Sequence, residues 1–133
     1  MIQRVQSLFF FFSAICSVTI VYAFPVLQDE STDYLLTEFT YATFFIFLSV
    51  ALSAFSIFQF KNRKRQQLMA YVARLMITIA FLLIVFLRQE EGLEARAFGI
   101  GLFLFFIPYL ALFLAGYFVR KDEKLVKSAD RMR

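Results

Sequence analysis

The chain alternates between four long apolar runs and short charged segments, and the sign of the charge changes between one segment and the next. The runs cover residues 8–27, 39–60, 68–87 and 97–119. Each is close to the roughly 20 apolar residues that a helix needs to cross a hydrocarbon core about 30 Å thick. We predict an all-α integral membrane protein with four transmembrane helices, at about 7–27, 39–60, 68–87 and 97–119. These helices form one membrane domain of residues 1–133.

Basic residues gather in alternate connections, and this pattern predicts the orientation. Lys and Arg beside spanning helices tend to stay in the cytoplasm, whereas acidic residues have little influence. Placing both termini and the connection 61–67 in the cytoplasm puts 12 of the 14 basic residues there, Arg74 included, and leaves Arg88 and Arg96 outside. Seven of the 10 acidic residues then lie outside. We therefore expect both termini to be cytoplasmic.

The first apolar run has an alternative interpretation as a cleavable signal peptide. Val21 and Ala23 supply a small-residue cleavage pattern after a basic start. Removal of the run would leave an odd number of helices and place the two basic ends on opposite sides of the membrane. We therefore favour an uncleaved first helix.

Residue types that many membrane enzymes and exporters need are missing. The sequence has no His and one Cys, Cys16, which excludes bis-histidine haem ligation, histidine metal sites and a Cys-x-x-Cys relay within one chain. No Asp or Glu lies inside an apolar run, so the carboxylate of a proton-coupled exporter is missing too. We expect a protein that is not an enzyme, with no catalytic, cofactor-binding or metal residues and no cofactor.

Carboxylates cluster in the two connections that we place outside. Oxygen ligands of this kind suit divalent cations. No Asp-x-Asp spacing or Gly turn organises them, so we interpret them as residues that keep short loops hydrated. They are Asp29, Glu30, Asp33 and Glu38 in the first connection, and Glu90, Glu91 and Glu94 in the second.

Small residues recur at helical spacing in three of the runs. In lipid, small side chains let helix backbones approach closely, and such packing holds membrane helices together. We predict helix-packing faces here. The alternative is a serine-lined polar path, which would normally also carry an ionisable residue. The faces consist of Ser13 and Ser17, then Ala42, Ser49, Ser53 and Ser56, then Ala111 and Ala115.

Pro108 interrupts the fourth run. Because proline has no N–H and its ring clashes with the preceding turn, it frees the carbonyl of Leu104. We predict a kink near the middle of this helix, with a structural role.

Basic residues around the second connection and after the fourth run predict a surface for anionic headgroups or a protein partner. The candidate residues are Lys61, Arg63, Lys64, Arg65, Arg120 and Lys121. In the tail 120–133, Leu125, Ala129 and Met132 recur at helical spacing, which favours a short amphipathic helix at the membrane interface. Ribosomal RNA is an alternative partner that we disfavour, because no aromatic or Gly-rich element accompanies the charges.

Arg74 is the one ionisable residue well inside an apolar run. It lies six residues after Leu68, or about 9 Å along a helix, so its side chain can extend to the interface. We expect it to snorkel there, or to pair with Asp122 or Glu123, or with free backbone carbonyls at the end of the fourth helix. The functional alternative is an anion or lipid-phosphate site formed with Tyr71, one turn away.

The two ends of the chain carry its most distinctive sequence, MIQRVQS at residues 1–7 and DEKLVKSADRMR at residues 122–133. Together with the four-span layout, these segments resemble a family of small inner-membrane proteins of the Bacteroidota, catalogued only as a domain of unknown function (family 4293). The resemblance covers the whole chain and implies the inner membrane of a Gram-negative bacterium. It carries over no catalytic or ligand residue, because the family has none assigned.

Two functions from different classes fit these features. The first is a non-enzymatic accessory subunit that packs against other integral membrane subunits of a larger inner-membrane complex. The second is a homo-oligomeric transporter, channel or lipid-binding protein, in which the serine faces and the Pro108 kink line a pathway. We favour the first, because no ionisable residue marks a path through the core.

Overall fold

Four helices long and apolar enough to cross a membrane make up most of the structure, a computed structural model that describes residues 2–28, 33–59, 61–90 and 97–131. Helix α1 covers Ile2–Ala23, α2 covers Thr40–Phe58 and α3 covers Arg63–Glu90. The fourth consists of α4 (Ile100–Leu104) and α5 (Phe106–Arg131). The predicted set of four apolar helices is therefore confirmed.

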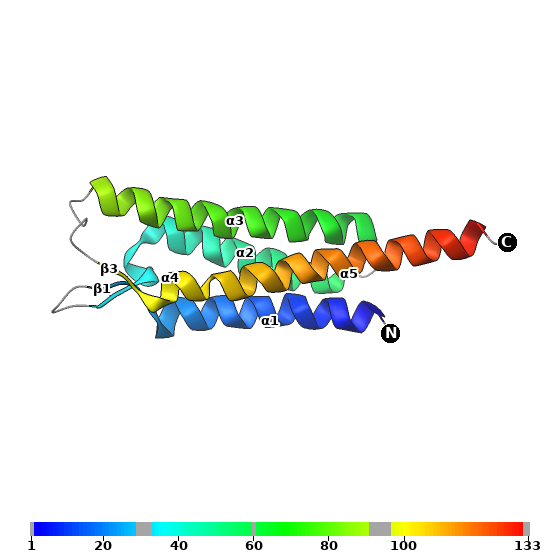
Figure 1. The fold of residues 1–133 in the computed structure, drawn as a ribbon, viewed down its shortest axis with the longest axis horizontal. Helices are drawn as coiled ribbons and strands as arrows, with labels where there is room; N and C mark the ends of the chain where they lie inside the picture. The colour runs from blue at the N-terminus through cyan, green and yellow to red at the C-terminus, as the bar shows by residue number, and fades with distance from the viewer. Residues whose placement is uncertain (1, 29–32, 60, 91–96, 132–133) are drawn as a thin grey trace.

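The helices form a ring in which α1 packs against α2 and α5, and α3 packs against the same two helices. Consecutive helices run in opposite directions, so both ends of the chain lie at one end of the bundle (Figure 1). This end also holds the turn between α2 and α3, and we call it the basic end. The opposite end, where a small sheet lies, is called the sheet end.

The sheet has three short antiparallel strands in the order β2-β1-β3. They are β1 (Pro25–Gln28), β2 (Asp33–Leu35) and β3 (Ala97–Phe98), and a 3₁₀ turn, η1 (Leu36–Glu38), follows β2. Val26 and Leu27 in β1 and Leu36 in η1 are fully buried. The sequence predicted helix over most of β1 and over β3, and a hydrated loop at β2. The sheet instead covers this end of the bundle core.

Helix ends differ from the predicted ones because of local capping and proline residues. Helix α1 stops at Ala23 because Pro25 cannot continue it and disfavours helical geometry at Phe24. Helix α3 starts at Arg63, five residues before the apolar run, because the side-chain oxygen of Asn62 accepts the N–H of Arg65 at 3.3 Å. An Asn at this position satisfies an otherwise unpaired donor of the first turn.

The fourth helix differs from expectation at both ends. It is interrupted at Phe105, three residues before Pro108, so the break lies toward the sheet end and not near the middle of the run. The carbonyl of Pro108 accepts a hydrogen bond from the Ser13 hydroxyl at 3.1 Å. At the other end, α5 runs unbroken to Arg131. The segment after residue 119 is thus an extension of the spanning helix, not a separate interfacial helix.

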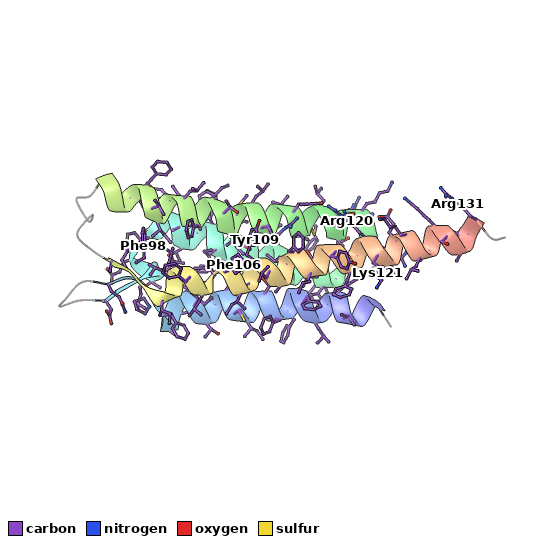
Figure 2. All side chains as sticks on the ribbon, viewed as in Figure 1. Phe98, Phe106, Tyr109, Arg120, Lys121 and Arg131 are labelled. Carbon is purple, nitrogen blue, oxygen red and sulfur yellow. The ribbon has the colours of Figure 1, made fainter. Side chains whose placement is uncertain are left out.

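Small residues occupy the interior of the bundle. Ser53 and Ser56 donate to the carbonyls of Ser49 and Leu52, each at 2.8 Å. On α3, Ala70, Ala73 and Ala80 are buried. Many large apolar side chains project outward (Figure 2), although some, such as Phe10 and Leu112, are fully buried. The predicted small-residue positions are all buried between helices of the same chain, namely Ser13, Ser17, Ala42, Ser49, Ser53, Ser56, Ala111 and Ala115.

Close backbone contact at the sheet end depends on two glycines. A Cβ on Gly101 would lie 2.7 Å from the carbonyl oxygen of Pro25, and one on Gly99 would lie 2.2 Å from the same atom. The Gly99 N–H donates to the carbonyl of Val26 at 2.8 Å. Any larger residue would push the start of α4 away from β1.

We predict that Gly101→Ala lowers the free energy of unfolding by about 1 to 3 kcal/mol, the usual cost of overpacking, although alanine favours helices. Gly116→Ala is the matched control within α5, because its added Cβ would lie an ordinary 3.8 Å from the Cβ of Ala70. The control should be neutral or slightly stabilising. Denaturant titration of the purified protein in detergent, followed by circular dichroism, measures both. Equal stability of the two variants would contradict the close contact.

Candidate functional site at the basic end

Basic side chains surround the end of the bundle that holds both termini. Lys61, Lys64 and Arg65 are exposed at the turn between α2 and α3. Arg120 and Lys121 are exposed on α5, and Figure 2 shows Arg131 further along the same helix. The structure therefore brings five of the six predicted surface cations together as an exposed rim, whereas Arg63 is partly buried.

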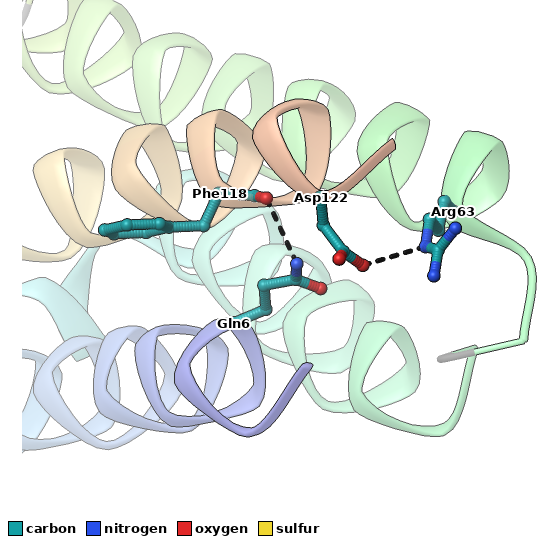
Figure 3. A network of polar contacts seen from close by, with 4 residues as sticks. All are labelled: Gln6, Arg63, Phe118 and Asp122. Carbon is teal, nitrogen blue, oxygen red and sulfur yellow. Dashed lines mark hydrogen bonds and ion pairs between the residues drawn. The ribbon is translucent and has the colours of Figure 1, made fainter. Parts of the chain in front are cut away.

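Buried polar contacts join the helices below this rim. The Arg63 Nε lies 2.9 Å from Oδ2 of Asp122, which ties α3 to α5 (Figure 3). Gln6 Nε2 donates to the carbonyl of Phe118 at 3.2 Å, which ties α1 to α5. Gln66 Nε2 donates to the carbonyl of Ser56 at 3.1 Å, which ties α3 to α2. All four helices are thus linked at this end.

These contacts were not predicted from the sequence, although a signal for them is present there. Gln66 begins a buried stripe on α3 that continues through Ala70, Ala73 and Ile77 at alternating spacings of four and three. Asp122 ends the corresponding stripe on α5, after Ala115 and Val119. Such spacing marks the core-facing side of a helix. A polar residue that continues a stripe is therefore expected to face the core and to need a partner there.

Arg74 lies between aromatic rings on the seam of α3 and α5. Its guanidinium carbon is 4.5 Å from the ring centroid of Tyr71 and 5.4 Å from that of Phe113. Arg120 lies on the Tyr71 ring as well, at 5.0 Å. Side chains on a helix lean toward its N-terminus, so Arg74 extends toward the basic end, the direction that snorkelling requires.

The expected pairing of Arg74 with Asp122 or Glu123 is wrong. Asp122 pairs with Arg63, and Glu123 pairs with Lys127 at 3.3 Å one turn further along α5. Within the described part of the chain, Arg74 has no carboxylate partner, and its Nε is buried without a hydrogen-bond acceptor. Arg63 lies three helical turns closer to the basic end, level with Asp122, so it takes the pair.

Outside the basic end, the structure places few of the predicted polar residues in a common site. Asp33 and Glu38 are exposed near the sheet, and the other predicted acidic residues lie outside the residues whose side chains are described. Among the described residues, no group of three or more His, Cys, Asp or Glu side chains gathers as metal ligands would. Cys16 is half-buried within α1.

The described residues thus form a bundle of four antiparallel helices, long and apolar enough to cross a membrane, with polar contacts at one end and a small sheet at the other. The chain belongs to the family described as a domain of unknown function, DUF4293, whose model matches residues 2–132. This match confirms the resemblance drawn from the sequence. No curated protein and no solved structure shows a significant match to the chain.

We predict that Arg63→Gln destabilises the bundle by about 1 to 3 kcal/mol, less than a fully buried pair would, because both partners keep partial access to solvent. Adding Asp122→Asn should recover part of the loss, since the double variant leaves no unpaired charge. Lys127→Gln breaks the exposed pair with Glu123 and serves as the control, with a cost below about 0.5 kcal/mol. Unfolding titrations of the unaltered chain, Arg63→Gln, Asp122→Asn and the double variant give the coupling energy. If the stability losses of the two single variants add up to the loss of the double variant, Arg63 and Asp122 do not interact.

Proposed function

We propose that the protein is a non-enzymatic accessory subunit of a larger complex in a bacterial inner membrane. In this proposal the basic end faces the cytoplasm. Docking uses the α5 extension, defined as residues 123–131. The observation that carries the proposal is that α5 continues past the other helices as one unbroken helix, with residues 124–131 exposed (Figure 1).

The direction of the α5 extension favours a protein partner over the membrane surface. At 1.5 Å per residue, Arg131 lies about 14 Å beyond Asp122 along the helix axis. Charges separated by more than a Debye length, about 8 Å at physiological salt, interact weakly. Because α5 continues past the other helices as the same helix, its extension does not turn aside as a separate interfacial helix would (Figure 1).

The α5 extension offers a mixed surface to such a partner. Leu125 and Val126 are 50% and 38% exposed. Lys124, Lys127 and Arg131 flank them. A partner with an apolar pocket and nearby carboxylates would complement this surface, because charge complementarity sets the orientation of binding and apolar burial contributes affinity.

The interior of the bundle supports a structural role. The buried polar side chains of Gln6, Ser13 and Gln66 all donate to backbone carbonyls of other helices. Ser53 and Ser56 donate within α2. Because these side chains already donate to backbone carbonyls, their donors are not free to bind a transported substrate or to take part in a reaction. For that reason we place the homo-oligomeric transporter or channel second.

The test is purification of a tagged chain from native membranes in mild detergent, with a variant that ends at Glu123. This truncation keeps the Arg63 and Asp122 pair and removes a net charge of three, from Lys124, Lys127, Arg131 and Arg133 less Asp130. We expect the full chain to recover foreign membrane subunits in fixed stoichiometry and the truncated chain to lose them.

The matched control is the triple variant Lys61→Gln, Lys64→Gln, Arg65→Gln, which removes the same net charge from the turn between α2 and α3. It should keep the foreign subunits. Unchanged recovery with the truncated chain would contradict docking by the α5 extension. A full chain that purifies only with itself would instead support the homo-oligomer.

A further inference from the structure

Two hollows lie along the seam between α3 and α5, one lined by cations and one apolar. The first, of about 110 Å³, is lined by Arg74 and Arg120 with Tyr71, Tyr117 and Gln67. We call it the basic groove. The second, of about 540 Å³, lies toward the sheet end, and we call it the apolar groove. Its lining comes from the middle of α3, from α4 and from the start of α5, and includes Ile77, Phe81, Leu102, Phe103, Phe106 and Tyr109.

The grooves follow one another along the same two helices. Thr78 of the apolar groove is one turn beyond Arg74 on α3, and its hydroxyl donates to the Arg74 carbonyl at 3.0 Å. Tyr109 is one turn before Phe113, which lines the basic groove. Figure 2 shows the labelled Phe106, Tyr109 and Arg120 in this order along α5. The seam therefore changes from apolar to cationic toward the basic end.

The basic groove holds two cations without a counter-ion. Within the described residues, neither Arg74 nor Arg120 forms an ion pair, whereas Arg63 and Lys127 do. Their guanidinium carbons lie 4.5 Å and 5.0 Å from the Tyr71 centroid, so they are separated by at most the sum, 9.5 Å. Both line the basic groove, and a phosphate held there would accept charge-assisted bonds of about 2.8 Å.

The aromatic rings prepare the two cations for an anion. Stacking on Tyr71 holds each guanidinium with less freedom than a solvated side chain would have. Arginine presents its donors as a planar fork that matches the oxygens of a phosphate. The buried Nε of Arg74 adds a donor that lacks an acceptor within the described chain. Such a donor is satisfied by a bound ligand or by water.

We propose that this seam binds one anionic glycerophospholipid, with its phosphate between Arg74 and Arg120 and an acyl chain in the apolar groove. The apolar groove lies next to the basic groove along the same two helices, which favours a lipid over a free phosphate, because a free phosphate would leave the apolar groove empty. Phe103 and Phe106 are 67% and 63% exposed, so the apolar groove opens sideways to a bilayer. The site does not depend on docking by the α5 extension.

The test is native mass spectrometry of the delipidated full chain in mild detergent. It is titrated with dioleoyl phosphatidylglycerol or with dioleoyl phosphatidylcholine, which has the same chains but no net charge. We expect one phosphatidylglycerol to bind at least tenfold more tightly than phosphatidylcholine. Arg120→Gln should remove this preference, and Arg74→Gln should do the same. Lys121→Gln, the neighbouring cation outside the basic groove, should keep it.

Circular dichroism melting of each variant establishes that it is folded. Arg120 is exposed, so Arg120→Gln tests the site even where Arg74→Gln fails to fold. An unchanged preference in folded Arg120→Gln would overturn the proposal. Equal binding of the two lipids by the unaltered chain would overturn it as well. Glycerol 3-phosphate serves as the probe for a free anion. If it displaces the lipid at equal concentration, the site binds the phosphate alone and the acyl chain adds no affinity, which would overturn the proposal.

Discussion

Close approach of helix backbones is the interaction on which the rest of this structure depends. Inside a bilayer, helices gain little from hiding apolar side chains from lipid, so packing and interhelical hydrogen bonds must hold them together. Serine, alanine and glycine on the buried stripes allow that approach, and the Ser13 hydroxyl reaches the carbonyl of Pro108 across it. Many phenylalanine, tyrosine and leucine side chains project outward and give the bundle an apolar exterior of the kind that a membrane accepts.

The two ends of the bundle are closed by different contacts. Where spanning helices meet water, backbone and polar groups still need partners. At the sheet end, β1 lies against Gly99 and Gly101 so closely that no Cβ fits. At the basic end, Gln6, Gln66 and the pair of Arg63 with Asp122 join all four helices. This second closure also anchors the start of the α5 extension and leaves Arg74 and Arg120 free of carboxylates within the described residues.

Much of the bundle is predictable from the sequence, because an apolar run of about 20 residues has few other outcomes. Stripes of Ser49, Ser53 and Ala115 predict buried faces by spacing alone. The small sheet was not predictable, since β1 pairs with β3 about 70 residues later and neither strand is long enough to show a pattern. The partner of Asp122 was not predictable either. Several basic residues lie at that end, and only the rotation of α3 and α5 about their axes places Arg63 next to Asp122. The continuation of α5 to Arg131 was not predicted, because the sequence changes from apolar to charged after Val119.

We propose that this bundle spans the membrane with its basic end in the cytoplasm and with α5 continuing into the cytoplasm. Single cysteines in a Cys16→Ala background, treated with a membrane-impermeant maleimide, test it directly. Cysteine at Ser128 or Lys64 should react only in inverted inner-membrane vesicles. Cysteine at Asp33 should react only in spheroplasts, and cysteine at Ser53, buried within α2, in neither. Reaction of Ser128→Cys and Asp33→Cys from the same side of the membrane would contradict the account.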